Sequence, residues 1–267
     1  MSANEFRAQH GEDRILAREY AGKRSGYYVE VGAYNGESYS NTFYLEKSLG
    51  WTGVLVEADP ALASKCRAVR PNSKTFNCAA VSPGSPAEVT FEVVEGCQWV
   101  SSLSVTGAML KRIEDIPVTI RRMTVTAKTL DVILQECGAP TGIDFISIDV
   151  EGHEHGVLQG FTPTRWNAKT IILERNHHMP DARVMRYMHA NGFRWRRTTG
   201  PNDWFYAAGA CPSSRYRCWL FFRYYLPKYL TFWKPVLNGP VKRCIKWPLR
   251  KLGVLDMIRR RRLAHRH

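Results

Sequence analysis

The sequence lacks the segments that would direct a chain into or across a membrane. No uninterrupted apolar run is long enough to span a bilayer, and the opening MSANEFRAQHGEDRIL has no apolar core of the kind that a signal peptide needs. The seven cysteines are widely spaced, without a CxxC pair or the His and Cys spacing of a metal site. We therefore expect reduced thiols and a cytoplasmic protein that is neither secreted nor membrane-spanning.

Common phosphate-binding and nucleophile motifs are also missing. The chain contains neither GxGxxG nor GxxxxGK[ST], which argues against a bound pyrophosphate. The serines of WVSSLS, residues 99–104, lack the GxSxG context of a nucleophile elbow. We expect these serines to make polar contacts instead.

Positive charge is abundant, and it is concentrated at one end of the chain. The formal net charge is +14, and residues 211–267 carry 15 Lys or Arg against a single acid, Asp256. We predict a formally neutral domain, 1–210, followed by a basic, aromatic-rich extension, 211–267. Such an extension suits a peripheral position at an anionic membrane surface or docking on a partner. Nucleic-acid binding and a solvated tail are its alternatives.

Strand and helix patterns alternate through the neutral part, which is typical of βαβ units. Strands are predicted at 27–31, 54–57, 74–78, 88–94, 118–125, 143–148, 170–174, 193–197 and 204–208. Helices are predicted at 39–49, from Asp59 and Pro60 to a stop before Pro71, around 130–137, through Val157 and Leu158, and around 184–188. The fold class is therefore α/β. Residues 95–115 show no strong period and are predicted to form a mobile cap over a crevice.

The most informative stretch is IDFISIDVEGHEHGVLQG, residues 143–160. Its apolar run is too hydrophobic for a strand with one wet face, so it predicts a central strand of a parallel sheet. Asp149, Glu151, His153 and Glu154 follow directly, at the strand end where α/β proteins bind ligands. An active site and a polar loop with ion pairs explain this turn about equally well when it is taken alone.

Two further strands end in acids. Glu30 ends the strand within YYVEVGAYNGES, where Gly32 and Gly36 allow a close backbone approach to a ligand. Glu57 ends the next strand, where a carboxylate can accept hydrogen bonds from both hydroxyls of a ribose. The alternatives without a ligand are a tight structural turn for the glycines and a helix-capping role for Glu57. The combination of the two acids with the glycine turn favours a nucleoside ligand.

These motifs, in their order, resemble those of the FkbM-type methyltransferases, within the class I fold that depends on S-adenosyl-L-methionine. The resemblance rests on the segments QHGED, VEVGAYNGES, SNTFYLEKSLGWTGVLVE, the ADP that follows it, NCAAV, TLD and IDFISIDVEGHEHGVLQG, from about residue 9 to 174. It implies a Rossmann-like, seven-stranded, mostly parallel sheet with helices on both faces. It also implies S-adenosylmethionine as cofactor.

The resemblance assigns cofactor contacts to successive strand ends. The amino-acid part and sulfonium would be surrounded by Glu30, Gly32, Ala33 and Gly36. The ribose would contact Glu57 beside Ala58, and the adenine would face Cys78 and Ala79. Asp149 would stand where cofactor and substrate meet. Tyr34 replaces a usually small residue of the family, which changes the inner shape of this turn.

The predicted reaction is methyl transfer to an oxygen, and the resemblance points to a sugar hydroxyl of a glycan or glycolipid. A hydroxyl of a secondary metabolite is the alternative. A poorly acidic hydroxyl needs a general base, for which Asp149 and His153 are the candidates, with Glu151 orienting the histidine. Glu174, before Asn176, His177 and His178, is a secondary candidate for substrate or metal binding. The spacing matches no standard metal site, so none is predicted.

Two other functions remain open on the sequence. Some proteins that resemble this motif set are not known to act as enzymes, so the fold could serve as a non-catalytic binding or adaptor module. A nucleic-acid methyltransferase is suggested by the basic extension alone. No NPPY-like or Pro-Cys nucleophile motif supports base methylation, so nucleic acid is a disfavoured partner.

Overall fold

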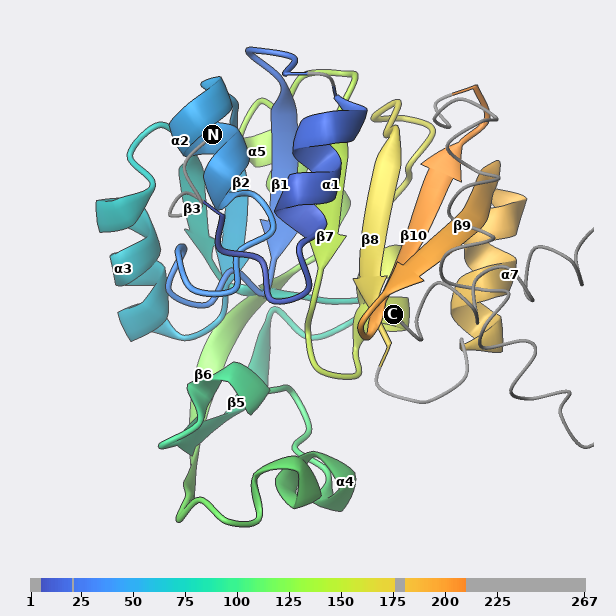
Figure 1. Cartoon of the computed structure of the whole chain (residues 1–267). Coiled ribbons are helices and arrows are strands. Elements are labelled where there is room, and N and C mark those ends of the chain that lie inside the picture. Colours follow the sequence, from blue (N-terminus) through green and yellow to red (C-terminus); the bar gives the residue numbers. More distant parts are fainter. Residues whose placement is uncertain (1–5, 21, 176–180, 210–267) are drawn as a thin grey trace, which may run out of the picture. The chain divides into compact units, whose positions relative to one another are not determined.

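A seven-stranded sheet organises the protein. The computed structural model describes residues 6–20, 22–175 and 181–209, and the predicted extension 211–267 lies outside them. The strands are β1 (Tyr27–Val31), β2 (Thr52–Glu57), β3 (Lys74–Asn77), β7 (Phe145–Ile148), β8 (Thr170–Glu174), β9 (Phe193–Thr199) and β10 (Asn202–Ala207). Their order is β3-β2-β1-β7-β8-β10-β9, and β10 runs antiparallel to both of its neighbours (Figure 1). The predicted α/β class and mostly parallel sheet are confirmed.

Helices cover both faces of this sheet, as predicted. They are α1 (Glu12–Glu19), α2 (Phe43–Leu49), α3 (Pro60–Val69), α5 (Leu130–Glu136), α6 (Glu154–Gln159) and α7 (Ala182–Ala190). Side chains of α1 and α2 pack with Tyr28 and Phe145 on one face. Side chains of α5, α6 and α7 pack with Val29 and Ile146 on the other. Because side chains alternate across a strand, covering both faces requires apolar side chains on both sides of β1 and β7, which are mostly apolar apart from Glu30 and Ser147.

Helix α2 begins later than its apolar pattern predicts. Ser40 Oγ, the Asn41 backbone amide and Thr42 Oγ1 donate to the Glu30 carboxylate at 2.8, 2.9 and 2.6 Å. These residues therefore wrap around the end of β1, and the helix starts at Phe43. Helix α3 follows its pattern, because the Asp59 side chain accepts from the amide of Ala61 at its first turn.

A second, three-stranded sheet was not foreseen as a separate unit. It consists of β4 (Ala79–Ala80), β6 (Thr119–Lys128) and β5 (Glu88–Glu95), in the order β4-β6-β5. The predicted strands 88–94 and 118–125 are confirmed, and they pair with each other antiparallel. In Figure 1 this sheet lies beyond the carboxyl ends of the main parallel strands.

The segment 95–115 connects β5 to β6 and carries short helices that its sequence did not indicate. These are the 3₁₀ turns η2 (Gln98–Val100) and η3 (Lys111–Ile113) and the helix α4 (Gly107–Leu110). They enclose a small core of their own, formed by Val94, Cys97, Val100 and Ile113. Within the described residues, no helix is both long and apolar enough to cross a bilayer.

Candidate active site

The ends of three parallel strands are joined by backbone contacts at Gly32. Gly32 has φ 80°, and a methyl group on its Cα would overlap the backbone carbonyl oxygen of Asp149. The amides of Gly32 and Ala33 both donate to the Val56 carbonyl, at 3.0 and 3.2 Å. The turn after β1 is therefore held against β2 on one side and against the end of β7 on the other. A side chain at position 32 would force these strands apart.

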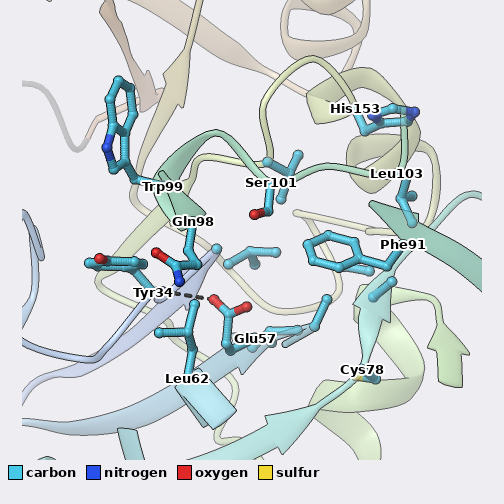
Figure 2. A pocket seen from close by; sticks show the side chains of 17 residues that line it. Tyr34, Glu57, Leu62, Cys78, Phe91, Gln98, Trp99, Ser101, Leu103 and His153 are labelled. Atoms are coloured by element: carbon cyan, nitrogen blue, oxygen red, sulfur yellow. Dashed lines mark hydrogen bonds between the residues drawn. The ribbon is translucent and has the colours of Figure 1, made fainter. Parts of the chain in front are cut away.

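One cavity, which we call the nucleoside cavity, opens at the ends of β1, β2 and β4 (Figure 2). It encloses about 600 Å³ of space, part of it open to solvent. Its lining includes Gly32, Glu57, Ala58, Cys78, Ala79 and, from the other side, Phe91, Gln98, Trp99 and Leu103. A carboxylate among apolar side chains at this position suits a nucleoside, because it can accept hydrogen bonds from the ribose hydroxyls.

Glu57 is the ionisable centre of the nucleoside cavity. Its carboxylate accepts hydrogen bonds from the backbone amides of Tyr34 and Asp59, at 2.8 and 2.9 Å. Burial raises its pKa to about 7, although these amides work in the opposite direction. Both amides hold the carboxylate in place and leave it able to accept from a ligand.

Glu30 has a different kind of environment. Besides its three hydrogen bonds to residues 40–42, it lies 3.8 Å from the guanidinium of the fully buried Arg70. Glu30 lines a second cavity together with Gly32 and Ala33. Ser40 and Asn41, which Glu30 holds in place, line the same cavity. Glu30 therefore shapes the predicted cofactor site and contributes to its wall.

Gly36 is placed differently from the prediction. It lines neither cavity, and a Cβ atom there would lie 3.0 Å from Cα of Cys66 and 3.3 Å from Cγ of Arg70. With φ 79°, it lets the turn pack closely on α3. The structure gives Gly36 a packing role in place of the predicted cofactor contact.

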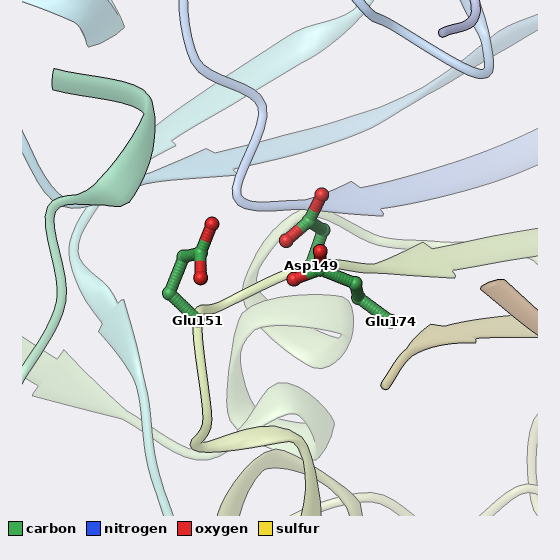
Figure 3. Close-up of side chains that lie close together, drawn as sticks. All are labelled: Asp149, Glu151 and Glu174. Atoms are coloured by element: carbon green, nitrogen blue, oxygen red, sulfur yellow. The ribbon is translucent and has the colours of Figure 1, made fainter. Parts of the chain in front are cut away.

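The second cavity, which we call the carboxylate cavity, contains the acids that follow β7 and end β8. It encloses about 820 Å³, again partly open to solvent. Figure 3 shows Asp149, Glu151 and Glu174 facing one another, and an oxygen from each lies within 4.8 Å of the others. Glu151 reaches this position through a left-handed turn, with φ 49°. Glu154 fixes that turn by accepting from the Gly152 amide at 3.0 Å.

Burial and neighbouring acids raise the pKa of two of these carboxylates, those of Asp149 and Glu151. Asp149 exposes surface to the cavity, yet enclosing protein atoms and then the neighbouring Glu174 raise its pKa well above the usual value. Burial and Glu174 also raise the pKa of Glu151 to about 7. Opposing this rise, the Arg112 guanidinium lies 2.8 Å from Glu151. A carboxylate with a raised pKa is a stronger base, which suits it to proton transfer near neutral pH.

His153 lies in the other cavity. It lines the nucleoside cavity, its Nδ1 is 3.4 Å from Ser102 Oγ, and burial lowers its pKa. Glu151 pairs with Arg112, so the structure does not support the predicted orientation of His153 by Glu151. The predicted polar role of the serines is confirmed, since Ser102 Oγ also donates to the Glu151 carbonyl at 3.0 Å.

Several residues of the carboxylate cavity were not found from the sequence. Arg112 and Trp99 come from the segment 95–115, and Asn41 donates to Ser147 Oγ at 2.9 Å in its wall. Arg112 lies in a segment without periodicity, so the sequence does not indicate that it pairs with Glu151. Glu174 was recognised as a strand-terminal acid, whereas His177 and His178 lie outside the described residues.

The cavities fit the cofactor that the motifs imply. Glu57 presents a buried acceptor where ribose hydroxyls would lie, and the glycine turn leaves room for backbone to approach the ligand. Gly32, Tyr34 and Trp99 line both cavities, so the two cavities adjoin at these residues.

Comparison with known proteins identifies the family of this chain. The family model described as "Methyltransferase FkbM domain" matches residues 30–195, which is more than half of the chain. No curated protein matches.

Solved structures with a similar fold include several methyltransferases. One is a TehB-like SAM-dependent methyltransferase from Corynebacterium glutamicum, with 10% identity, 74% of this chain and 88% of that chain covered, and a TM-score of 0.39. Another is a SAM-dependent methyltransferase from Aquifex aeolicus, with 12% identity, coverage of 74% and 91%, and a TM-score of 0.39. From the match to the family model, we conclude that this chain belongs to the FkbM methyltransferase family and uses S-adenosylmethionine as its methyl donor.

Proposed function

We propose that this methyltransferase methylates an oxygen, namely a hydroxyl of a sugar in a glycan or glycolipid. The observation that carries the proposal is the carboxylate cavity beside the predicted donor site. Its three acids can accept hydrogen bonds from several hydroxyls of one acceptor. An anionic acceptor would be disfavoured next to these acids.

Exposed aromatic side chains in the same cavity support a sugar. Tyr39 is 56% exposed and Trp99 is 40% exposed, and both line the cavity. Flat aromatic faces next to carboxylates suit a ring that has apolar C–H faces and polar hydroxyl edges. A secondary-metabolite hydroxyl of similar shape would meet the same groups.

The proposed chemistry needs one proton acceptor. The bound sulfonium supplies an activated methyl group. Asp149, held at the end of β7, takes the proton of the acceptor hydroxyl as the new C–O bond forms. Glu151 and Arg112 form the opposite wall and orient the acceptor. His153 lies in the nucleoside cavity, so we assign the proton to Asp149 in preference to His153.

The basic extension completes the proposal. A cytoplasmic, peripheral position at an anionic membrane would place a lipid-linked glycan within reach of the cavity. This part of the proposal rests on the composition of residues 211–267, which lie outside the described part of the chain.

Labelled methyl transfer to a panel of cell-envelope glycans and glycolipids tests the function. We expect Asp149→Asn to lower kcat by about 10²- to 10⁴-fold, the usual contribution of a general base. S-adenosylmethionine affinity should change little. His153→Ala is the comparison variant, and loss of transfer in that variant alone, with unchanged S-adenosylmethionine affinity, would return the role of base to the histidine. A wild-type protein that binds no S-adenosylmethionine would instead favour an adaptor module.

A further inference from the structure

The three acids of the carboxylate cavity converge from separate parts of the fold. Asp149 follows β7, Glu151 lies in the turn after it, and Glu174 ends the neighbouring strand β8. One oxygen of each lies within 4.8 Å of the other two, and the carboxylates face a common space in Figure 3. Oxygens around one cation at about 2.1 to 2.4 Å lie about 3 to 4.8 Å apart. The geometry is therefore that of ligands sharing an ion.

Glu174 gives an independent indication of a missing partner. Its side chain is 8% exposed, and its Oε2 has no hydrogen-bond partner among the described residues. Its other oxygen lies 3.9 Å from Arg112, beyond hydrogen-bond distance. A buried carboxylate oxygen without a donor is costly, and its neighbour here is Asp149, another acid, so a proton or a cation must lie between the two carboxylates.

A bound cation would also relieve the charge of this cluster. With all three carboxylates ionised, as they would be around a cation, the described residue that pairs with them is Arg112, beside Glu151 and Glu174. A divalent cation would neutralise the charge of minus two that these four groups then leave. Oxygen ligands of this kind select hard cations such as Mg²⁺ or Mn²⁺ over softer metals.

We infer that Asp149, Glu151 and Glu174 bind a single divalent cation of the Mg²⁺ or Mn²⁺ class. The sequence predicted no metal, because ligands this far apart in the chain match no standard spacing. The role of the ion, unlike its binding, rests on the proposed function. It would hold the acceptor hydroxyl and make its proton more acidic. Asp149 would take that proton as the bond between the methyl carbon and sulfur breaks and the new C–O bond forms.

The test is Mn²⁺ binding by the purified full chain after treatment with EDTA and removal of the chelator. Loss of the electron paramagnetic resonance signal of free Mn²⁺ measures occupancy, and Mg²⁺ should compete. We expect one Mn²⁺ per wild-type chain and an affinity lowered at least about tenfold in Glu174→Gln. Glu151→Gln serves as the second ligand variant if Glu174→Gln does not fold. The control Glu136→Gln removes an exposed acid of α5, paired with Lys128, and should leave binding unchanged.

Two results would overturn the inference: no Mn²⁺ bound by folded wild-type protein at millimolar concentration, or equal affinity in the wild type and the ligand variants. Failure of the proposed function is distinguishable. Mn²⁺ bound at these residues without methyl transfer to any sugar would remove the proposed acceptor and leave the metal site standing. Transfer by a protein that binds no Mn²⁺ would remove the metal site alone.

Discussion

The two cavities at the edge of the main sheet surround their acidic side chains with different neighbours. In the nucleoside cavity, Glu57 stands with two backbone amides that donate to it. In the carboxylate cavity, three acids lie close together beside the Arg112 guanidinium, and burial and the neighbouring Glu174 raise the pKa of Asp149 and Glu151. A carboxylate positioned by backbone suits recognition of a neutral ligand group, whereas closely spaced carboxylates suit proton or cation chemistry. We therefore predict that the first cavity serves cofactor binding and the second serves the reaction.

The largest effect should come from a change that breaks both cavities together. Gly32→Ala places a methyl group against the Asp149 carbonyl, in a backbone conformation that alanine rarely adopts. We expect loss of S-adenosylmethionine binding and of methyl transfer. Urea denaturation should show a loss of stability well above the about 1 kcal/mol that positive φ alone costs.

Gly84→Ala is the matched control for this variant. Gly84 has φ 81°, nearly that of Gly32, but a Cβ atom there would meet nothing within 4 Å. Gly84→Ala should lose stability from the unfavourable φ alone, without a steric overlap, and should still bind the cofactor. Equal losses in the two variants would show that the contact between the β1 turn and Asp149 is unimportant.

A smaller effect should be confined to the nucleoside cavity. Glu57→Gln keeps the size of the side chain but replaces one acceptor oxygen with a donor, so one cofactor hydroxyl loses its partner. We expect S-adenosylmethionine to bind about 10- to 100-fold more weakly, the usual effect of a lost hydrogen bond to a charged group. Calorimetry measures this, and Mn²⁺ binding should not change. An unchanged cofactor affinity would contradict the assignment of Glu57 to the ribose.

The smallest effect concerns pH. Since the pKa of Glu57 is raised to about 7, the carboxylate is mostly protonated at pH 6 and mostly ionised at pH 8. Cofactor affinity should therefore rise about tenfold across this range in the wild type and far less in Glu57→Gln. Stability should move the other way. The folded-state pKa lies above the unfolded value, so the contribution of Glu57 is present at low pH and is lost as pH rises through about 7.

Signals that are local in the sequence predicted most of the fold. The apolar runs of β1 and β7 and the acids that end them needed no knowledge of distant residues. The start of α2 was missed because Glu30, ten residues earlier, takes hydrogen bonds from residues 40–42. The apolar spacing of a helix cannot reveal that hydrogen bonds to Glu30 keep residues 40–42 out of it. The separate sheet of β5 and β6 was missed because strand patterns do not specify which sheet a strand joins.

The sequence did not indicate that Asp149 and His153 line different cavities. Asp149 and His153 are four residues apart, but α6 begins only at Glu154, and the turn before it has positive φ at Glu151 and Gly152. The two side chains therefore enter different cavities. Arg112 lies across the fold from Glu151, a contact that depends on how the segment 95–115 packs. Neither feature has a signature in residue spacing.

The contact between Gly32 and the Asp149 carbonyl has a consequence for how acceptor choice can change. It links the donor and acceptor sides through peptide backbone, independently of the side chains that surround the acceptor. Trp99 and Arg112, in contrast, belong to a segment between two strands of the smaller sheet. Substitution of Arg112, which lines the carboxylate cavity and not the nucleoside cavity, would therefore be expected to change the preferred acceptor while this backbone contact stays intact.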